Sequence, residues 1–331
     1  GLIGAGIRAY DHMDGVGNRY GVHTVILEVD GEEVFRSVVD RFAYEENRYI
    51  NSWTHGQYMK SFIEPGNRLR MLHASNGNRG LVEINEERPY RFVYTLSDAL
   101  GNTSKVRFTV QGKNTEIHPV EHREKYAFKW DRTNYLQEPG LELVVPRGML
   151  YDDVWLDYSV RADSGDVAFT YQLHNKRVPL HGACEMRIGL RRDRLEDKSK
   201  YYVAGVTARG GKYSIGGTYE DGFMKVRIRD LGTYTVAVDT VPPEIIPLNP
   251  GQWGRTGRIT LKAKDKETGI NSYRGTIDGK YALFGKPNSI SGNLVCELDP
   301  KHVKKGGRHT VEMTVTDGRG NRTTEEFHFV W

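Results

Sequence analysis

The chain reads Thr316-Asp317-Gly318-Arg319-Gly320-Asn321-Arg322-Thr323 near its end and Ser97-Asp98-Ala99-Leu100-Gly101-Asn102-Thr103-Ser104 near its beginning. In both stretches an Asp-x-x-Gly-Asn turn separates two segments in which apolar and polar residues alternate. Gly and Asn supply the positive φ angles of tight hairpins, and an alternation of period two indicates half-buried antiparallel strands. A pattern that occurs twice decides the fold, because it predicts related β domains at the two ends of the chain.

A second pair of turns supports the same repeat. Asp30-Gly31 follows an alternating segment at 24–29, and Asp278-Gly279 follows one at 270–277. Each pair is preceded by an acidic segment that ends in Gly, at 11–15 and at 265–269. Short strands joined by such turns are typical of immunoglobulin-like sandwiches. The sequence therefore predicts an all-β fold of tandem immunoglobulin-like β-sandwich domains with almost no helix.

Three domains are predicted from the length of 331 residues and from two breaks in the alternation. The first domain is 1–112, an immunoglobulin-like sandwich. The second, 113–240, lacks the Asp-Gly pattern and is predicted to be a distinct β-sandwich. It is followed by Pro242-Pro243, where paired prolines cannot continue a ladder and form a stiff connector. The third, 241–331, is predicted to be an immunoglobulin-like sandwich related to the first.

Composition excludes several classes of protein. The net charge is only +4, and the basic run at 187–194 is followed directly by acidic residues, so it reads as a solvated strand edge and no nucleic-acid partner is expected. No apolar stretch is long enough for a membrane-spanning helix. Cys184 and Cys296, the two cysteines, fall in different predicted domains and read as small buried hydrophobes without a disulfide. Gly1 is not a natural start, so the chain reads as a fragment or a mature piece.

Acidic pairs offer the first candidate metal sites. Asp11 with Asp14, and Asp265 with Glu267, have spacings that occur in calcium loops. Neither pair continues into the full EF-hand series, which ends in a distal bidentate Glu. Capping of a turn by the Asp side chain is therefore the favoured interpretation.

Histidine pairs offer the other candidates. His118 and His122 flank Pro119, which disfavours the helix that would bring them together. His181 and Glu185 fall on one strand, where positions four apart are about 13 Å apart, too far for one ion. No Gly-x-Ser-x-Gly elbow is present. The sequence thus predicts no catalytic residue, no cofactor-binding residue and no metal ligand in this chain, and no enzyme activity for it.

The best candidate contact surface is an aromatic segment at 41–58 that breaks the alternation. It contains Arg48, Tyr49, Trp53 and Tyr58. Aromatic residues and Arg are enriched in interfaces and in sugar-binding platforms. The alternative is that these side chains cover an open end of the sandwich core.

Several stretches also resemble one family. These are 6–11, 41–51, the turn at 98–102, 144–153 and the linker at 239–243. They are similar to the region that follows the catalytic domain in LytM-like (lysostaphin-type) peptidoglycan metallopeptidases of Bacteroidetes. The resemblance covers nearly the whole chain and is most specific in the first domain.

The resemblance implies that this chain takes no part in the zinc-dependent catalysis of that family. The zinc site of that family uses a His-x-x-x-Asp motif and a His-x-His motif, and none of the eleven histidines here fits either one. The zinc, and a zinc peptidase domain that binds it, are therefore expected upstream, in a full-length zinc metallopeptidase.

This chain would be its non-catalytic accessory region, positioning that domain in the periplasm or cell envelope. Its partners would be the upstream domain, docked on the aromatic segment, and peptidoglycan or an envelope protein. The alternative is a stand-alone carbohydrate-binding or adhesin-like β-sandwich module.

Overall fold

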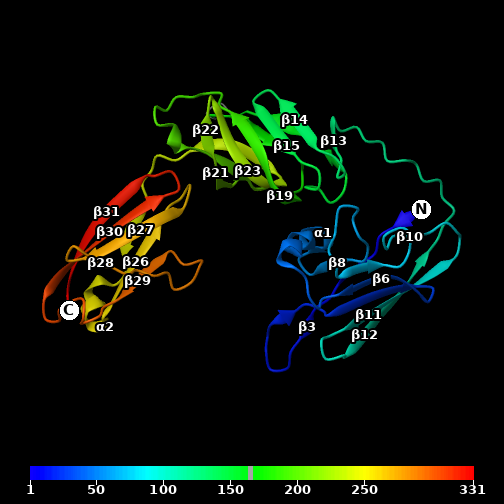
Figure 1. The fold of residues 1–331 in the computed structure, drawn as a ribbon, viewed down its shortest axis with the longest axis horizontal. Coiled ribbons are helices and arrows are strands. Elements are labelled where there is room, and N and C mark those ends of the chain that lie inside the picture. The colour runs from blue at the N-terminus through cyan, green and yellow to red at the C-terminus, as the bar shows by residue number, and fades with distance from the viewer. Residues whose placement is uncertain (163–166) are drawn as a thin grey trace.

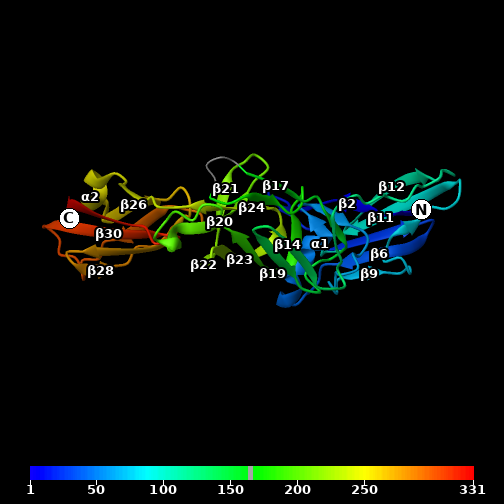
Figure 2. The ribbon, with the colours of Figure 1, turned by 90° about the horizontal axis from the view of Figure 1, so that it is seen from above.

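A computed structural model describes residues 1–162 and 167–331. Its regular secondary structure consists almost entirely of antiparallel strands, which confirms the all-β fold class. Three separate hydrophobic cores follow one another along the chain, and the two termini lie at opposite ends of the molecule (Figure 1). Seen from above, the three units form an elongated row (Figure 2). No helix of the described part is long and apolar enough to cross a membrane.

The first unit packs a five-stranded sheet, in the order β12-β11-β5-β6-β9, against a small sheet β2-β8-β7. Its core is made by the apolar face of the alternating strands, including Leu27, Phe92 and Tyr94. The elements are β1 (Leu2–Ile3), β2 (Gly6–Arg8), β3 (Asp11–His12), β4 (Arg19–Tyr20), β5 (Thr24–Val29), β6 (Glu32–Val38), the 3₁₀-helix η1 (Tyr44–Tyr49), α1 (Ile50–Trp53), β7 (Thr54–His55), β8 (Tyr58–Lys60), β9 (Leu72–Ala74), β10 (Val82–Glu83), β11 (Pro89–Ser97) and β12 (Thr103–Gln111).

The middle unit has two five-stranded sheets, β14-β15-β19-β23-β22 and β17-β18-β24-β20-β21. Leu136, Met186 and Tyr171, each fully buried, lie in the core. The elements are β13 (Tyr126–Phe128), β14 (Asn134–Glu138), β15 (Leu141–Val145), β16 (Val154–Leu156), β17 (Ser159–Arg161), β18 (Thr170–Gln172), β19 (Val178–Gly189), the 3₁₀-helix η2 (Lys198–Lys200), β20 (Tyr201–Val206), β21 (Lys212–Gly216), β22 (Thr218–Glu220), β23 (Phe223–Leu231) and β24 (Thr233–Val238).

The third unit packs the sheet β28-β27-β30-β31 against β25-β26-β29. Trp253, Leu261 and Met313 are buried between them. The elements are β25 (Glu244–Pro247), the 3₁₀-helix η3 (Pro250–Gln252), α2 (Trp253–Thr256), β26 (Arg258–Lys264), β27 (Ile270–Ile277), β28 (Lys280–Ala282), β29 (Asn293–Glu297), β30 (Arg308–Asp317) and β31 (Arg322–Val330).

The first and third units share one strand order, β6-β5-β11-β12 in one and β28-β27-β30-β31 in the other. Their short hairpins are built alike. Asp30 has φ 54° and is followed by Gly31 with φ 90°, and Asp278 has φ 49° and is followed by Gly279 with φ 76°. Positive φ at both central positions is the type I′ geometry that suits twisted strands.

The long hairpins also close with the same hydrogen bonds. Asp98 Oδ1 accepts from the backbone N–H groups two and four residues further on, and its Oδ2 accepts from Asn102 Nδ2 at 2.6 Å. Asp317 Oδ1 accepts from the same two positions, and its Oδ2 accepts from Asn321 Nδ2 at 2.7 Å. The surroundings differ, because the turn of Asp98 faces solvent whereas Asp317 is only 1% exposed.

Candidate functional site

The aromatic segment lies at the end of the first unit that faces the middle unit (Figure 1). Arg48 crosses this joint, because its Nη2 donates to the carbonyl of Leu180 at 3.0 Å and its carbonyl accepts from the hydroxyl of Tyr151 at 2.6 Å. The ring of Tyr49 lies 4.2 Å from that of His181 and 5.9 Å from that of Tyr151. Arg48 and Tyr49 therefore contact the middle unit of the same chain.

Trp53 and Tyr58 lie elsewhere. Trp53 is 5% exposed in the core of the first unit, and its Nε1 donates to the carbonyl of Lys60 at 3.0 Å. Tyr58 is 42% exposed on β8, and in the described residues no hydrogen bond or ring contact joins it to the middle unit. The alternation rule could not place Trp53, because the residue belongs to the short helix α1, where period two does not apply.

Close backbone approach tightens this joint. The N–H of Gly66 donates to the carbonyl of Tyr151 at 2.7 Å. A Cβ at position 66 would lie 2.6 Å from the carbonyl oxygen of Leu150, so only glycine fits there without a shift of the backbone. The first and middle units thus meet through a specific contact, not through a loose tether.

Acidification is expected to weaken the first joint through His181. Burial, and then the positive charge of Arg48, lower the pKa of His181 below its ordinary value of 6.5. Tyr49 and Tyr151 also face the ring. When the joint opens, the ring regains water and leaves the charge of Arg48, so the open form binds the proton first as the pH falls. The stabilisation of the joint is therefore complete above about pH 6.5 and is lost progressively below it. Small-angle scattering between pH 7 and pH 5 should show the units separating.

The control for this prediction is a matched pair of variants. His181→Gln should remove most of the pH dependence of the scattering profile. His174→Gln should not, because His174 lies in the middle unit with Asp157 and away from the joint, although its pKa is also lowered by burial. An unchanged profile in the wild-type chain at pH 5 would contradict the prediction.

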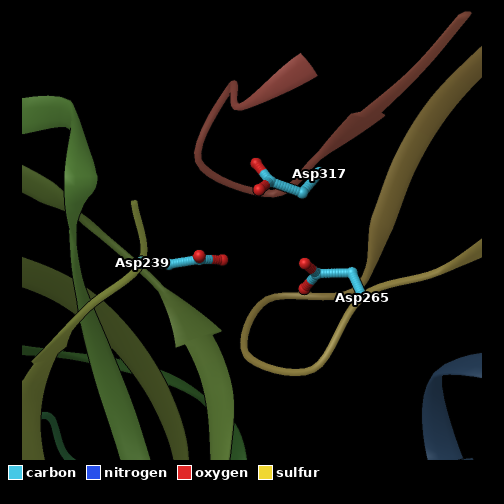
Figure 3. Close-up of side chains that lie close together, drawn as sticks. All are labelled: Asp239, Asp265 and Asp317. Atoms are coloured by element: carbon cyan, nitrogen blue, oxygen red, sulfur yellow. The ribbon is translucent and has the colours of Figure 1, made fainter. Parts of the chain in front are cut away.

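The second joint holds a cluster of three carboxylates. Asp239 comes from the linker after β24, Asp265 from the loop after β26, and Asp317 is the last residue of β30. The three side chains point toward one another (Figure 3). One carboxylate oxygen from each lies within 4.8 Å of the others. Asp239 and Asp317 are each 1% exposed, and Asp265 is half-buried.

Neutral donors hold these carboxylates in place. Thr268 Oγ1 donates to Asp239 Oδ2 at 2.6 Å, and Asn321 Nδ2 donates to the carbonyl of Asp239 at 3.0 Å. Asp265 Oδ2 accepts from the backbone N–H groups of residues 267, 268 and 269 at 3.1, 2.8 and 2.7 Å. In the part of the chain that the structure describes, no ion pair joins any of the three to Lys or Arg.

Arg319 anchors the third unit to the middle one. Its Nη1 donates to the carbonyls of Tyr201 and Gly217 at 2.9 and 3.0 Å. Lys200 Nζ donates in return to the carbonyl of Arg319 at 3.0 Å. Burial lowers the pKa of Arg319, although Asp317 and the linker carboxylate act in the opposite direction.

The connector between these units is also fixed. Thr323 Oγ1 donates to the carbonyl of Pro243 at 2.5 Å, and Asn321 holds the carbonyl of Asp239. Both ends of the linker 239–243 are thus bonded to β31 or to the turn before it. The paired prolines stiffen the segment between them.

Sequence reasoning singled out Asp265 but paired it with Glu267. The structure turns Glu267 toward Tyr202, whose hydroxyl donates to Glu267 Oε2 at 2.9 Å. Asp239 and Asp317 were missed, because their approach depends on how two domains meet. The other candidate pair, Asp11 with Asp14, belongs to no three-ligand cluster in the described ranges. Asp11 Oδ1 accepts from the backbone N–H of His12 at 2.8 Å.

The geometry of the cluster suits a hard cation, since Ca²⁺ and Mg²⁺ prefer carboxylate and carbonyl oxygens. Three carboxylates held this close repel one another, although the charge of Arg319 acts on Asp239 and Asp317 and offsets part of that repulsion. Ca²⁺ is therefore expected to stabilise the second joint, by about 2.7 kcal/mol when free Ca²⁺ is about 100 times its Kd. Thermal unfolding with added Ca²⁺ and with EDTA measures the effect.

The matched controls are two substitutions that keep the size of the side chain. Asp265→Asn should abolish the response to Ca²⁺, and Asp98→Asn, in a turn without neighbouring carboxylates, should leave it intact. An unfolding midpoint that changes with neither Ca²⁺ nor EDTA would contradict the prediction. It would show that the hydrogen bonds from Asn321, Thr268 and the backbone offset the repulsion between the carboxylates without a cation.

Three solved structures are similar over most of this chain. One is the SGBP-B protein of a Bacteroides ovatus mixed-linkage glucan utilization locus, solved with a mixed-linkage heptasaccharide: 11% identity, TM-score 0.16, covering 92% of this chain and 59% of that one. A Ca²⁺-stabilized adhesin of an Antarctic bacterium that binds ice has 10% identity and a TM-score of 0.18, over 94% and 90% of the two chains. A 1.5-MDa bacterial ice-binding adhesin has 9% identity and a TM-score of 0.17, over 95% and 87%. At these values the likenesses carry no argument about this chain.

No curated protein matches the chain. One family model does match part of it, and the matched residues are those of the middle unit, from just before β13 to just after β24. The match leaves the first and third units outside. Over residues 125–239 the chain is therefore similar to the Zu5-like domain family.

Proposed function

We propose that this chain is a non-catalytic, adhesin-like or carbohydrate-binding segment of the cell envelope, in which tandem β-sandwich units hold binding surfaces at set distances. The observation that carries the proposal is the pair of specific joints. Arg48 bonds the first unit to the middle one, and Arg319 bonds the third unit to the middle one. Such joints suit a stiff spacer, because each junction costs free energy to bend.

The state of the two cysteines is consistent with a non-catalytic role. Cys184 and Cys296 are buried, and burial raises the pKa of both thiols to about 11. A thiol with so high a pKa is almost entirely protonated near neutral pH and is a poor nucleophile. These two cysteines therefore act as core residues, packed in the middle and third units.

Attachment to a zinc peptidase domain is the other candidate, and the family resemblance of the first unit is the observation that favours it. The coding sequence upstream of residue 1 distinguishes the two candidates. His-x-x-x-Asp and His-x-His motifs there would assign the chain to a peptidase, and further β-sandwich units would assign it to an adhesin-like protein.

Co-sedimentation with insoluble polysaccharides and with purified peptidoglycan tests the proposed function. The full chain is expected to bind at least one of these materials without releasing reducing ends or amino groups. Release of either product would overturn the non-catalytic role. Failure to bind any of the materials would overturn the binding role.

A further inference from the structure

One sheet of the middle unit has a polar row on its outer face. Ser159 pairs with Gln172 and Gln172 with Thr233, across β17, β18 and β24, and the row ends at the apolar Val206 on β20. Directly opposed residues point to the same side of a sheet. The next row in the same register includes Tyr171, which is fully buried, so the polar row faces away from the core. Figure 2 shows this sheet, with β17, β24, β20 and β21 labelled.

A cavity of about 580 Å³ lies over this row. Its floor includes Gln172 and Thr233, and loops at 174–177 and 207–210 form its walls. Ligand pockets of small molecules have volumes of this order. The cavity is therefore large enough for a few sugar rings.

The backbone carbonyl and N–H of Asp157 orient two neutral side chains of the cavity, Gln172 and His174. Gln172 Nε2 donates to the carbonyl of Asp157 at 3.0 Å, which leaves the Gln172 Oε1 as an acceptor. The N–H of Asp157 donates to His174 Nδ1 at 3.1 Å, so the proton of the neutral ring lies on Nε2 and can be donated. A fixed acceptor beside a fixed donor matches the hydroxyl groups of a saccharide, which both donate and accept.

The charged side chains that line the cavity in the described part of the chain have one sign. Arg161, Lys176 and Arg177 line it, and no acidic side chain does so among residues 1–162 and 167–331. Arg177 is partly neutralised by Asp230, whose Oδ2 accepts from Arg177 Nη2 at 2.6 Å. Arg161 and Lys176 are solvent-exposed and add positive potential at the rim. The ligand that this lining favours carries a negative group as well as hydroxyls.

We propose that this cavity binds an acidic oligosaccharide, with its carboxylate or sulfate against Lys176 and Arg161 and its hydroxyls against Gln172 and His174. The inference rests on the proposed carbohydrate-binding function and assigns it to one site. Three basic residues are too few for the extended phosphate contacts of a nucleic acid, whose affinity comes from many neutralised charges.

Isothermal titration of the full chain tests the proposal with four probes. These are an oligogalacturonate, a heparin-derived hexasaccharide, cellohexaose and a thymidine oligonucleotide. One of the two acidic saccharides is expected to bind more tightly than cellohexaose, and high salt should weaken that binding because exposed charges are screened. The comparison of the two acidic saccharides distinguishes carboxylate from sulfate recognition.

Variants locate the site. Lys176→Ala removes an exposed side chain, so the fold should persist, and the affinity should fall by about tenfold, a typical loss for a charged hydrogen bond. Gln172→Ala should weaken the binding of the acidic saccharide and of cellohexaose to the same extent. Arg132→Ala is the control, because Arg132 lies in the turn between β13 and β14, outside the cavity, beside Asp131.

Several results would overturn the inference. Tight binding of the oligonucleotide, equal binding of cellohexaose, or unchanged affinity in Lys176→Ala would each do so. Polysaccharide binding that survives in Lys176→Ala and Gln172→Ala would overturn the cavity while leaving the proposed function in place. Absence of all saccharide and polysaccharide binding would overturn both.

Discussion

Trp53→Ala is expected to lower the free energy of unfolding of the first unit by about 3–5 kcal/mol, the usual cost of truncating a buried Trp. The indole is 5% exposed among core side chains such as Met59 and Leu69, and its removal leaves a cavity there. The carbonyl of Lys60 also loses its donor. Denaturant unfolding, followed by circular dichroism, measures the loss.

Tyr44→Ala is the matched control for Trp53→Ala. Tyr44 belongs to the same aromatic segment but is 92% exposed, so its truncation should change stability by less than about 0.5 kcal/mol. A small loss in Trp53→Ala, with weaker binding to a partner, would instead assign the indole to a contact surface. The pair of variants thus separates the two interpretations that the sequence left open.

Asp317→Ala is expected to cost on the order of 3 kcal/mol or more, because buried donors that lose their partner cost about 1–3 kcal/mol each. Its Oδ1 accepts from the N–H groups of Arg319 and Asn321, and its Oδ2 accepts from Asn321 Nδ2. The thermal unfolding of the full chain and the rate of proteolysis in the linker 239–243 measure the effect. Cleavage there should accelerate as the joint opens.

Asp98→Ala is the control, since it removes the same hydrogen bonds from the equivalent turn of the first unit. Water can replace the lost partner there, so the cost should be near 1 kcal/mol. Asp317→Ala also removes one of three close carboxylates, which acts in the stabilising direction. An increase in stability would therefore show that repulsion outweighs the hydrogen bonds of the turn in the absence of a bound cation.

The local turns could be predicted from the sequence because a few residues determine them. Asp30-Gly31 and Asp278-Gly279 adopt the positive φ angles that their residue types favour. The alternation of apolar and polar residues likewise predicts the strands on either side, because it is also a local pattern. The segment that contains Arg48 and Trp53 was harder to predict, because it forms two short helices within a β domain. Each helix is too short for a helical periodicity to show, and the period of two of a strand does not apply there.

The carboxylate cluster could not be predicted, for a different reason. Asp239, Asp265 and Asp317 belong to a linker, a loop and the end of a strand that meet only when the third unit docks on the middle one. The contact of Arg319 with Gly217 likewise joins residues far apart in the sequence. Neither composition nor spacing encodes the relative placement of two folded domains.

The fixed linker between the middle and third units has a mechanical consequence. A load on the C-terminal unit would reach Asp239 and Pro243 through Asn321 and Thr323, because these side chains bond both ends of the connector. The connector itself has little slack to extend before those bonds break. A pull along the molecule is therefore shared by several hydrogen bonds at the second junction. The junction transmits the force with little extension, whereas a linker without these bonds would lengthen under the same load.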